Sequence, residues 1–283
     1  MRGLVKLFEA LLAIAIVLAA GLYVGSEWIL RRPHDVPDDR LAIPRDAASL
    51  AEGARLARLA GCRGCHGPDG QGATWSSDWL GGTIAPPAIA RKIAGYSNEE
   101  LVRLLRYGVK KDGSTLFIMS TAAIRNWSDE DLGRIVAWAR SVKPGPQDSL
   151  AETSYGPLPR LAMLTGTLRP SFRNVRLAPE RRPVETGRYF YDAICSECHH
   201  LGMETPMREG GQIAPALAPM AASYDLAGFR RLLRSGAGRS RRDLGLMREV
   251  ATESAQVLSD AEISALHSYL KGEAARLGRG PGE

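Results

Sequence analysis

Hydrophobic residues are unevenly distributed along this chain, which opens with one long apolar run and continues with amphipathic segments. Residues 10–26 contain no charged side chain, and the apolar stretch reaches from Leu7 to Leu30. A helix of this length is about enough to span a bilayer. We therefore expect residues 1–31 to form a transmembrane anchor. The alternative is a cleaved signal peptide, because Ala19-Ala20-Gly21 offers small residues for cleavage.

The residues that flank the apolar run predict its orientation. Arg2 and Lys6 precede it, and Tyr23 and Trp28 lie at its far end, where an aromatic belt is expected. The positive-inside rule puts the N-terminus in the cytoplasm, although Arg31-Arg32 on the far side weakens the rule here. We expect a single-pass protein of the inner (cytoplasmic) membrane whose remaining residues lie in the periplasm.

The rest of the chain shows the 3.6-residue period of amphipathic helices. Ser128 and Ser259 each precede such a helix and have an acidic residue three positions on, as an N-cap residue should. Ser97 and Glu100 form a further capping pair, before a middle helix. We therefore expect an all-α fold.

The two halves of the chain are related by an internal repeat. Glu52-Gly53-Ala54-Arg55-Leu56 faces Glu185-Thr186-Gly187-Arg188-Tyr189, and a Pro-Ala-Ile segment at Pro87 faces a Pro-Ala-Leu segment at Pro215. A length of 283 residues accommodates two such units. The expected organisation is an anchor over 1–31, a spacer over 32–46, a first unit over 47–143, an interdomain strap over 144–183, a second unit over 184–275 and a tail over 276–283. The apolar segment 158–164 should pack across both units.

Composition and charge narrow the class of protein only a little. Hydrophobic residues make up 45% of the chain and charged residues 24%, as in ordinary globular proteins. The formal net charge is +6, but no nucleic-acid-binding motif accompanies it. We expect no nucleic-acid partner.

The two pentapeptides Cys62-Arg63-Gly64-Cys65-His66 and Cys195-Ser196-Glu197-Cys198-His199 carry the candidate chemistry. Each is a C-x-x-C-H, the attachment signature of c-type haem. The two thiols can reach the vinyl groups along one porphyrin edge, and the histidine can then ligate the iron from below. These four are the only cysteines in the chain. We expect two covalently bound haem c groups.

Two other uses of these cysteines must be compared with haem. Together the pairs could form one four-thiolate zinc site, and each pair alone could be a redox dithiol. Zinc does not require a histidine directly after both pairs, and a thioredoxin-like site requires a βαβ context that the sequence lacks.

The second axial ligand separates an electron carrier from an enzyme. Met119 is the only methionine of the first half that follows the motif, and it lies in the loop before the last helix of that half. Met247 occupies the matching place in the second half, where Met203, Met207 and Met220 compete with it. We expect Met119 and Met247 to be the distal ligands.

The ordered set of C-x-x-C-H, Pro-x-Leu/Ile, methionine and terminal helix resembles a tandem dihaem member of the class I c-type cytochromes, over about residues 47–143 and 184–272. The resemblance implies that the carbonyls of Pro87 and Pro215 accept hydrogen bonds from His66 and His199. Two departures concern the distal loops: Met119-Ser120 and Met247-Arg248 replace the Met-Pro pair common in the family.

These features predict outer-sphere electron transfer without substrate chemistry, between membrane-associated partners such as a quinol-oxidising complex, a dehydrogenase or a terminal oxidase. The resemblance also fits a cytochrome subunit of a membrane-bound dehydrogenase. A dihaem peroxidase is the enzymatic alternative and would need one open iron position. Arg239, Arg241 and Arg242 could dock an acidic partner, or could form only a solvated loop.

Overall fold

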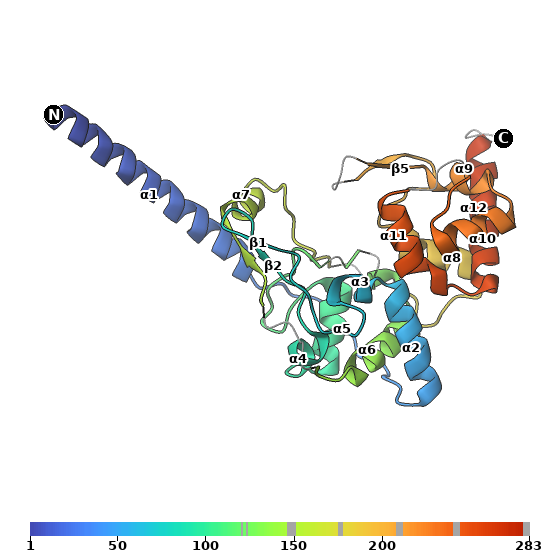
Figure 1. Cartoon of the computed structure of the whole chain (residues 1–283). Helices are drawn as coiled ribbons and strands as arrows, with labels where there is room; N and C mark the ends of the chain where they lie inside the picture. Colours follow the sequence, from blue (N-terminus) through green and yellow to red (C-terminus); the bar gives the residue numbers. More distant parts are fainter. Residues whose placement is uncertain are drawn as a thin grey trace.

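A computed structural model describes the chain apart from residues 120, 123, 146–150, 175–177, 208–211, 240–243 and 280–283. It is mostly helical. Helix α1 (Arg2–Arg31) extends away from two packed helical units, and the second unit lies on the side of the first that faces away from α1 (Figure 1). Two small antiparallel sheets, which the all-α expectation did not include, complete the described structure.

The first unit is built around two helices that cross at a glycine. Helices α2 (Ala47–Leu59) and α6 (Asp129–Ser141) meet where a Cβ atom on Gly53 would lie 2.1 Å from the carbonyl oxygen of Arg134. Only glycine allows so close an approach. Shorter helices complete the unit: α3 (Cys62–His66), α4 (Ile89–Ile93), α5 (Asn98–Tyr107) and the 3₁₀ turn η1 (Ile124–Asn126).

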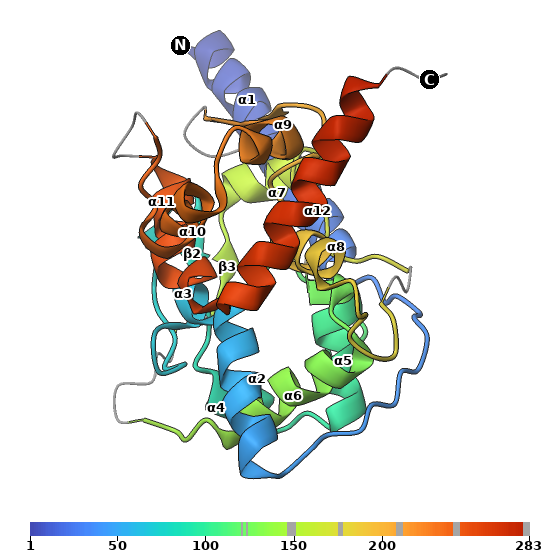
Figure 2. The same cartoon turned by 90° about the vertical axis from the view of Figure 1, so that its right-hand side faces the viewer.

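The second unit has a similar crossing. Helix α8 (Thr186–Phe190) packs on α12 (Asp260–Gly278), where a Cβ atom on Gly187 would lie 2.3 Å from the carbonyl oxygen of Ala265 (Figure 2). The remaining elements are η2 (Tyr191–Cys195), β4 (Thr205–Pro206), β5 (Ile213–Ala214), α9 (Leu217–Ala222), α10 (Leu226–Ser235), α11 (Leu246–Glu253) and η3 (Ala255–Val257). The sequence repeat places Thr186 opposite Gly53, but the structure gives the crossing to Gly187. The chain takes different paths to the first cysteine: α2 ends before Gly61, whereas α8 continues into the π-helical turn η2.

The predicted helix starts are confirmed. Ser97, Ser128 and Ser259 are N-cap residues whose hydroxyls accept hydrogen bonds from backbone N–H groups. The caps on α5 and α12 are complete capping boxes, because Glu100 and Glu262 reach back to the N-cap residue. These local signals therefore fix where the main amphipathic helices begin.

The two units share one hydrophobic core and a set of ion pairs. Trp127 of the first unit meets Tyr189 of the second edge-to-face, with ring centroids 5.9 Å apart. The hydroxyl of Tyr189 donates to a carboxylate oxygen of Asp131 at 2.7 Å. Arg182, from the segment between the units, pairs with Asp131 and with Glu52, both at 2.8 Å. The interface is thus apolar at its centre and ionic beside it.

The two segments expected to be a spacer and an interdomain strap make specific contacts with the rest of the chain. In the segment 32–46, Asp39 is buried and accepts a hydrogen bond from Tyr107 at 2.8 Å. In the segment 144–183, β3 (Ser154–Tyr155) pairs with β2 (Gly82–Ile84), which pairs with β1 (Ser76–Asp78). Helix α7 (Pro157–Leu164) packs on α1 rather than across both units. The expectation for 158–164 is therefore corrected.

Candidate haem-binding sites

The first C-x-x-C-H motif forms its own short helix. Gly61 takes a left-handed conformation with φ of 74° and ends the path of α2, after which Cys62 begins α3. Cys62 and Cys65 are three positions apart on this helix and so share a face. His66 Nδ1 lies 2.7 Å from the carbonyl oxygen of Pro87. The motif and the proline loop are therefore joined on the side of the imidazole away from Nε2.

A glycine that the sequence analysis did not single out shapes this site. The N–H of Gly72 donates to the carbonyl oxygen of His66 at 2.8 Å, and Gly72 has a φ of 81°. A Cβ atom at this position would lie 2.9 Å from the carbonyl oxygen of Pro86. Gly72 thus lets the loop after the motif pass directly against the proline segment. The sequence signal was the glycine-rich run that follows His66.

The second motif also places its histidine against a proline carbonyl, but the chain enters this motif through the π-helical turn η2. Cys195 ends η2, and the N–H of His199 donates to the carbonyl oxygen of Cys195 at 2.9 Å. His199 Nδ1 lies 2.9 Å from the carbonyl oxygen of Pro215. The hydroxyl of Tyr191 donates to the carbonyl oxygen of His199 at 3.1 Å. Both halves therefore hold a histidine against a proline carbonyl.

This contact fixes the tautomer of each imidazole. A carbonyl oxygen only accepts, so the neutral ring must carry its proton on Nδ1 and keep the lone pair on Nε2. Burial lowers the pKa of His66 and of His199, while the proline carbonyl acts in the opposite direction. A neutral imidazole with a free Nε2 is the form that ligates iron, and the carbonyl raises its basicity.

The cysteine thiols lie in surroundings that suit covalent attachment better than thiolate chemistry. Burial raises the pKa of Cys62 and of Cys195 to about 12. A redox dithiol needs a thiolate near neutral pH, which this environment disfavours. Among the described residues, which include all four cysteines, no cluster of three or more His, Cys, Asp or Glu side chains could hold a metal ion. The two pairs therefore do not meet in a four-thiolate zinc site.

The candidate distal methionines both pack on the hydrophobic core. Met119 is half-buried there, and Ser171 donates from its hydroxyl to the carbonyl oxygen of Met119 at 2.8 Å. Met247 is half-buried near the start of α11. Of its competitors, Met220 also packs against the core from α9, whereas Met203 is 64% exposed. The donor set of each half, two thiols, an imidazole and a core-facing thioether, fits a haem c.

Two further histidines and one of the arginines considered for docking lie in the described part of the second unit. His200 is exposed. His267 is buried, with Nε2 lying 3.0 Å from the carbonyl oxygen of Tyr224. Arg239 donates to the carbonyl oxygen of Ser223 at 2.5 Å, while Arg241 and Arg242 lie outside the described residues.

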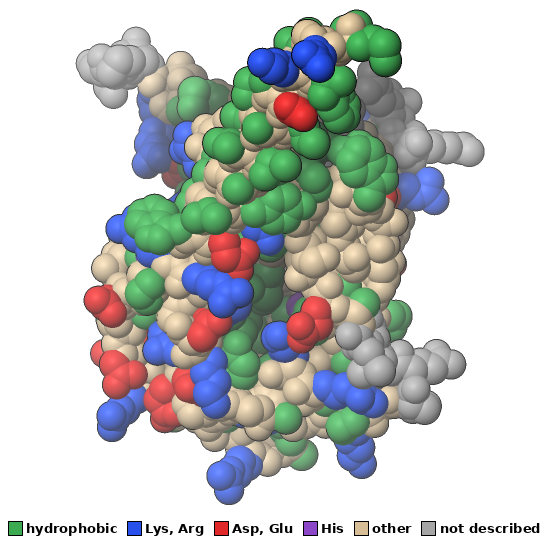
Figure 3. Space-filling view, turned by 90° about the vertical axis from the view of Figure 1, so that its left-hand side faces the viewer, with side chains coloured by type: hydrophobic (Ala, Val, Ile, Leu, Met, Phe, Trp, Pro, Cys, Tyr) green, Lys and Arg blue, Asp and Glu red, His purple; other side chains and the backbone are tan. Residues whose placement is uncertain are grey.

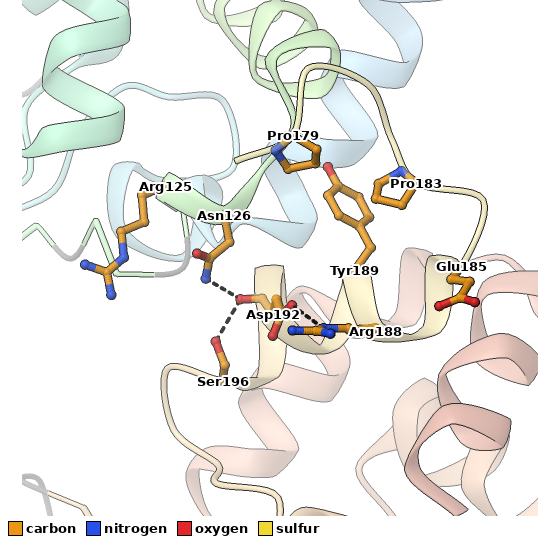
Figure 4. A pocket seen from close by; sticks show the side chains of 9 residues that line it. All are labelled: Arg125, Asn126, Pro179, Pro183, Glu185, Arg188, Tyr189, Asp192 and Ser196. Atoms are coloured by element: carbon orange, nitrogen blue, oxygen red, sulfur yellow. Dashed lines mark hydrogen bonds and ion pairs between the residues drawn. The ribbon is translucent and has the colours of Figure 1, made fainter. Parts of the chain in front are cut away.

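A polar cavity of about 500 Å³ lies at the seam between the two units, beside the second motif (Figure 4). Asn126 of the first unit and Ser196 of the motif both donate to the backbone oxygen of Asp192, at 2.6 and 2.7 Å. Arg188 pairs with the Asp192 carboxylate at 3.5 Å. These contacts tie the segment before Cys195 to the first unit, a link between units that the sequence did not predict.

Comparison with known proteins supports the assignment of a haem-binding domain to the first unit. Residues 48–138 match a family model described as cytochrome c oxidase, cbb3-type, subunit III. The chain therefore contains a cytochrome c domain, and the matched residues include all of α2 except Ala47 and most of α6. Such a domain implies covalently bound haem c.

Two curated relatives are similar to the chain at low identity. The fructose dehydrogenase cytochrome subunit of Gluconobacter japonicus is 27% identical over 225 residues, which cover 67% of this chain and 43% of the relative. The gluconate 2-dehydrogenase cytochrome c subunit of Pantoea cypripedii is 27% identical over 209 residues, which cover 63% of this chain and 47% of the relative. The matched region thus spans less than half the length of either relative.

Proposed function

We propose that this protein is a membrane-anchored dihaem c-type cytochrome that transfers electrons between membrane-associated respiratory partners on the periplasmic side. The observation that carries the proposal is the repeated proximal arrangement. In each half a C-x-x-C-H histidine turns Nδ1 to a proline carbonyl, at 2.7 Å for His66 and 2.9 Å for His199. Two segments far apart in the sequence thus reach the same histidine–proline geometry.

Each unit would hold one haem with its own residues. Cys62 and Cys65 in the first unit, and Cys195 and Cys198 in the second, would form the thioether links. His66 and His199 would offer Nε2 to the iron, with Met119 and Met247 on the opposite sides. Once bound, each haem supplies one-electron redox chemistry. The proposed units comprise residues 47–143 and 184–275.

Two axial protein ligands would leave no iron position for a substrate, which favours a carrier over a peroxidase. The described residues place a core-packed methionine in both halves. The two relatives are likewise named as cytochrome subunits of enzymes rather than as catalytic subunits. No substrate chemistry is therefore proposed for this chain itself.

The anchor proposal depends on α1. This helix is 30 residues long, and between residues 10 and 26 it carries no charged side chain and exposes mainly apolar ones. A cleaved signal sequence would have a similar composition, but α7 and Arg160 pack against the end of α1. Those contacts favour a retained helix, because cleavage would remove their partner. The first unit would then lie nearer the membrane than the second (Figure 1).

A second candidate is favoured by the comparisons: the protein could serve as the cytochrome subunit of a membrane-bound dehydrogenase complex. Its two relatives are named as cytochrome subunits of a fructose dehydrogenase and of a gluconate 2-dehydrogenase. In this role the electrons would come from a bound catalytic subunit instead of a diffusing partner. Purification of the native complex in mild detergent distinguishes the two, since only a subunit would co-purify with a dehydrogenase in fixed stoichiometry.

Intact mass under denaturing conditions tests the core of the proposal. The mass should exceed that of the polypeptide by two haem groups, and a Cys62→Ala/Cys65→Ala variant should lose one of them. Both haems should be low-spin when oxidised and when reduced, with slow binding of carbon monoxide. Release of either haem by denaturation alone would contradict covalent attachment. A high-spin fraction together with rapid peroxide reduction would favour the enzyme.

A further inference from the structure

Helix α7 presents a row of leucines that the described structure covers only in part. Leu158, Leu161 and Leu164 are 55%, 50% and 42% exposed. Spaced by three residues each, they share one side of the helix. Met163 points the other way and is buried. A row of half-exposed leucines on so short a helix is costly in water.

Helix α7 is fixed beside the end of α1. Arg160 donates to the hydroxyl of Ser26 at 2.8 Å and pairs with Glu27 at 3.0 Å. Its guanidinium also lies over the ring of Tyr23, 4.7 Å from the centroid. Gly25 makes room for Leu164, which would lie 3.0 Å from a Cβ atom at that position. The leucine face is therefore next to the apolar surface of α1.

The hairpin formed by β1 and β2 adds two exposed tryptophans, Trp79 in its turn and Trp75 directly before β1. Trp79 is 78% exposed and Trp75 is 51% exposed. The turn is held to the start of α7, because the N–H of Leu158 donates to the carbonyl oxygen of Leu80 at 3.1 Å. We call Leu158, Leu161, Leu164, Trp75 and Trp79 the interfacial surface. Figure 3 shows the face from which α1 projects, with hydrophobic side chains along α1 and around its base.

We propose that the interfacial surface lies in the boundary between lipid headgroups and acyl chains of the periplasmic leaflet, beside α1. The proposal rests on the proposed function only in requiring that α1 spans the membrane. Exposed tryptophans with leucines at the end of an apolar helix have the composition of a membrane interface. Arg32, whose guanidinium lies 5.4 Å from the centre of the Trp28 ring, adds a cation for lipid phosphates at the same level.

A lipid surface fits better than a protein partner because of this continuity. If α1 spans the bilayer, the bilayer surface must pass near Tyr23 and Trp28, and α7 is bound at that level. The interfacial surface would give the protein a second contact with the membrane. One helix alone allows the attached units to tilt and rotate, whereas two contacts restrict both motions. The orientation of the first unit toward membrane partners would then be fixed.

Photocrosslinking of the full-length holoprotein tests the proposal. The photoreactive residue p-benzoylphenylalanine replaces Leu161, and the protein is reconstituted in vesicles of phosphatidylethanolamine and phosphatidylglycerol. Leu277, at 52% exposure and near the end of α12, is the matched control. Ile14 within α1 is the positive control. We expect lipid adducts at Leu161 and Ile14, at a yield about tenfold above that at Leu277.

Each outcome decides the proposal. Lipid adducts at Ile14 but not at Leu161 would contradict the proposed membrane contact of the interfacial surface and leave the anchor proposal intact. A crosslinked dimer through Leu161 would also contradict it and would assign this face to a second copy of the chain. Absence of adducts at Ile14 would instead contradict the anchor. Replacement of Leu158 provides a second position on the same face, so that a misfolded Leu161 variant, recognised by its haem spectrum, does not decide the result.

Discussion

Ser171 holds the loop that carries Met119: its hydroxyl donates to the Met119 carbonyl oxygen at 2.8 Å. The backbone of Ser171 makes two further hydrogen bonds. Its N–H donates to the carbonyl oxygen of Leu116 at 2.7 Å, and its carbonyl oxygen accepts from the hydroxyl of Thr121 at 3.1 Å. Ser171 belongs to the segment between the two units. That segment therefore does more than connect them, because it sets the position of the proposed distal loop of the first haem.

Ser171→Ala should alter the first haem and leave the second unchanged. Loss of the hydrogen bond costs on the order of 1 kcal/mol and loosens the loop around Met119. Weaker thioether ligation favours the oxidised iron, so one of the two midpoint potentials should fall. Spectroelectrochemical titration measures both potentials in one sample. Ser235→Ala, which removes a hydroxyl bonded to Arg231 within α10, is the control and should leave both potentials in place.

Replacement of the proposed axial methionines should separate the two haems. Met119→His and Met247→His each exchange a thioether for an imidazole, which lowers the potential of a haem iron. Each variant should shift one midpoint potential downward and change one set of absorption bands. If Met247→His left both haems unaltered, Met220 would take over the role, because it is the other core-packed methionine among the described residues of the second unit.

The helix-crossing glycines should not tolerate a methyl group. At Gly53 and Gly187 an added Cβ atom would meet backbone carbonyl oxygens at 2.1 and 2.3 Å, so Gly→Ala must force the crossing helices apart. Overpacking of this kind costs about 1–3 kcal/mol or more. Urea denaturation of the holoprotein gives the change in the free energy of unfolding.

Gly272→Ala is the matched control for these two variants. Gly272 lies inside α12 with no atom within 4 Å of its would-be Cβ, so alanine should stabilise the helix by about 0.5–1 kcal/mol. Equal effects at all three positions would mean that backbone freedom, and not the close approach of helices, determines the outcome.

Local structure could be predicted from the sequence better than the contacts between distant segments could. The N-caps at Ser128 and Ser259 depend on neighbouring residues, and the structure confirms both. The path of α7 onto α1 could not be predicted in this way. Its apolar residues indicated burial, but their partner was set by Arg160 and Ser26, which are far apart in the sequence. The crossing at Gly187 was missed because η2 changes the path of the helix before Cys195.

The ion pairs at the seam between the units predict a dependence of stability on pH. Hydrogen bonds from Arg55, and then from Arg182, lower the pKa of Glu52 from 4.5 to about 2. Arg55 also pairs with Glu262 of the second unit at 2.8 Å. A carboxylate whose pKa is lower in the folded state stabilises that state above its unfolded pKa, and this contribution is lost as the pH falls through the folded value.

Glu52→Gln should therefore be destabilising at neutral pH, and the difference from the unaltered protein should shrink as the pH falls from about 5 to about 2. Glu204→Gln, at an exposed carboxylate outside this seam, is the control and should show a small difference at every pH. Urea denaturation across this pH range, followed by far-ultraviolet circular dichroism, measures the free energy of unfolding of each protein. A Glu52→Gln difference that stayed constant down to the lowest pH would show that Glu52 stabilises through packing rather than through its charge.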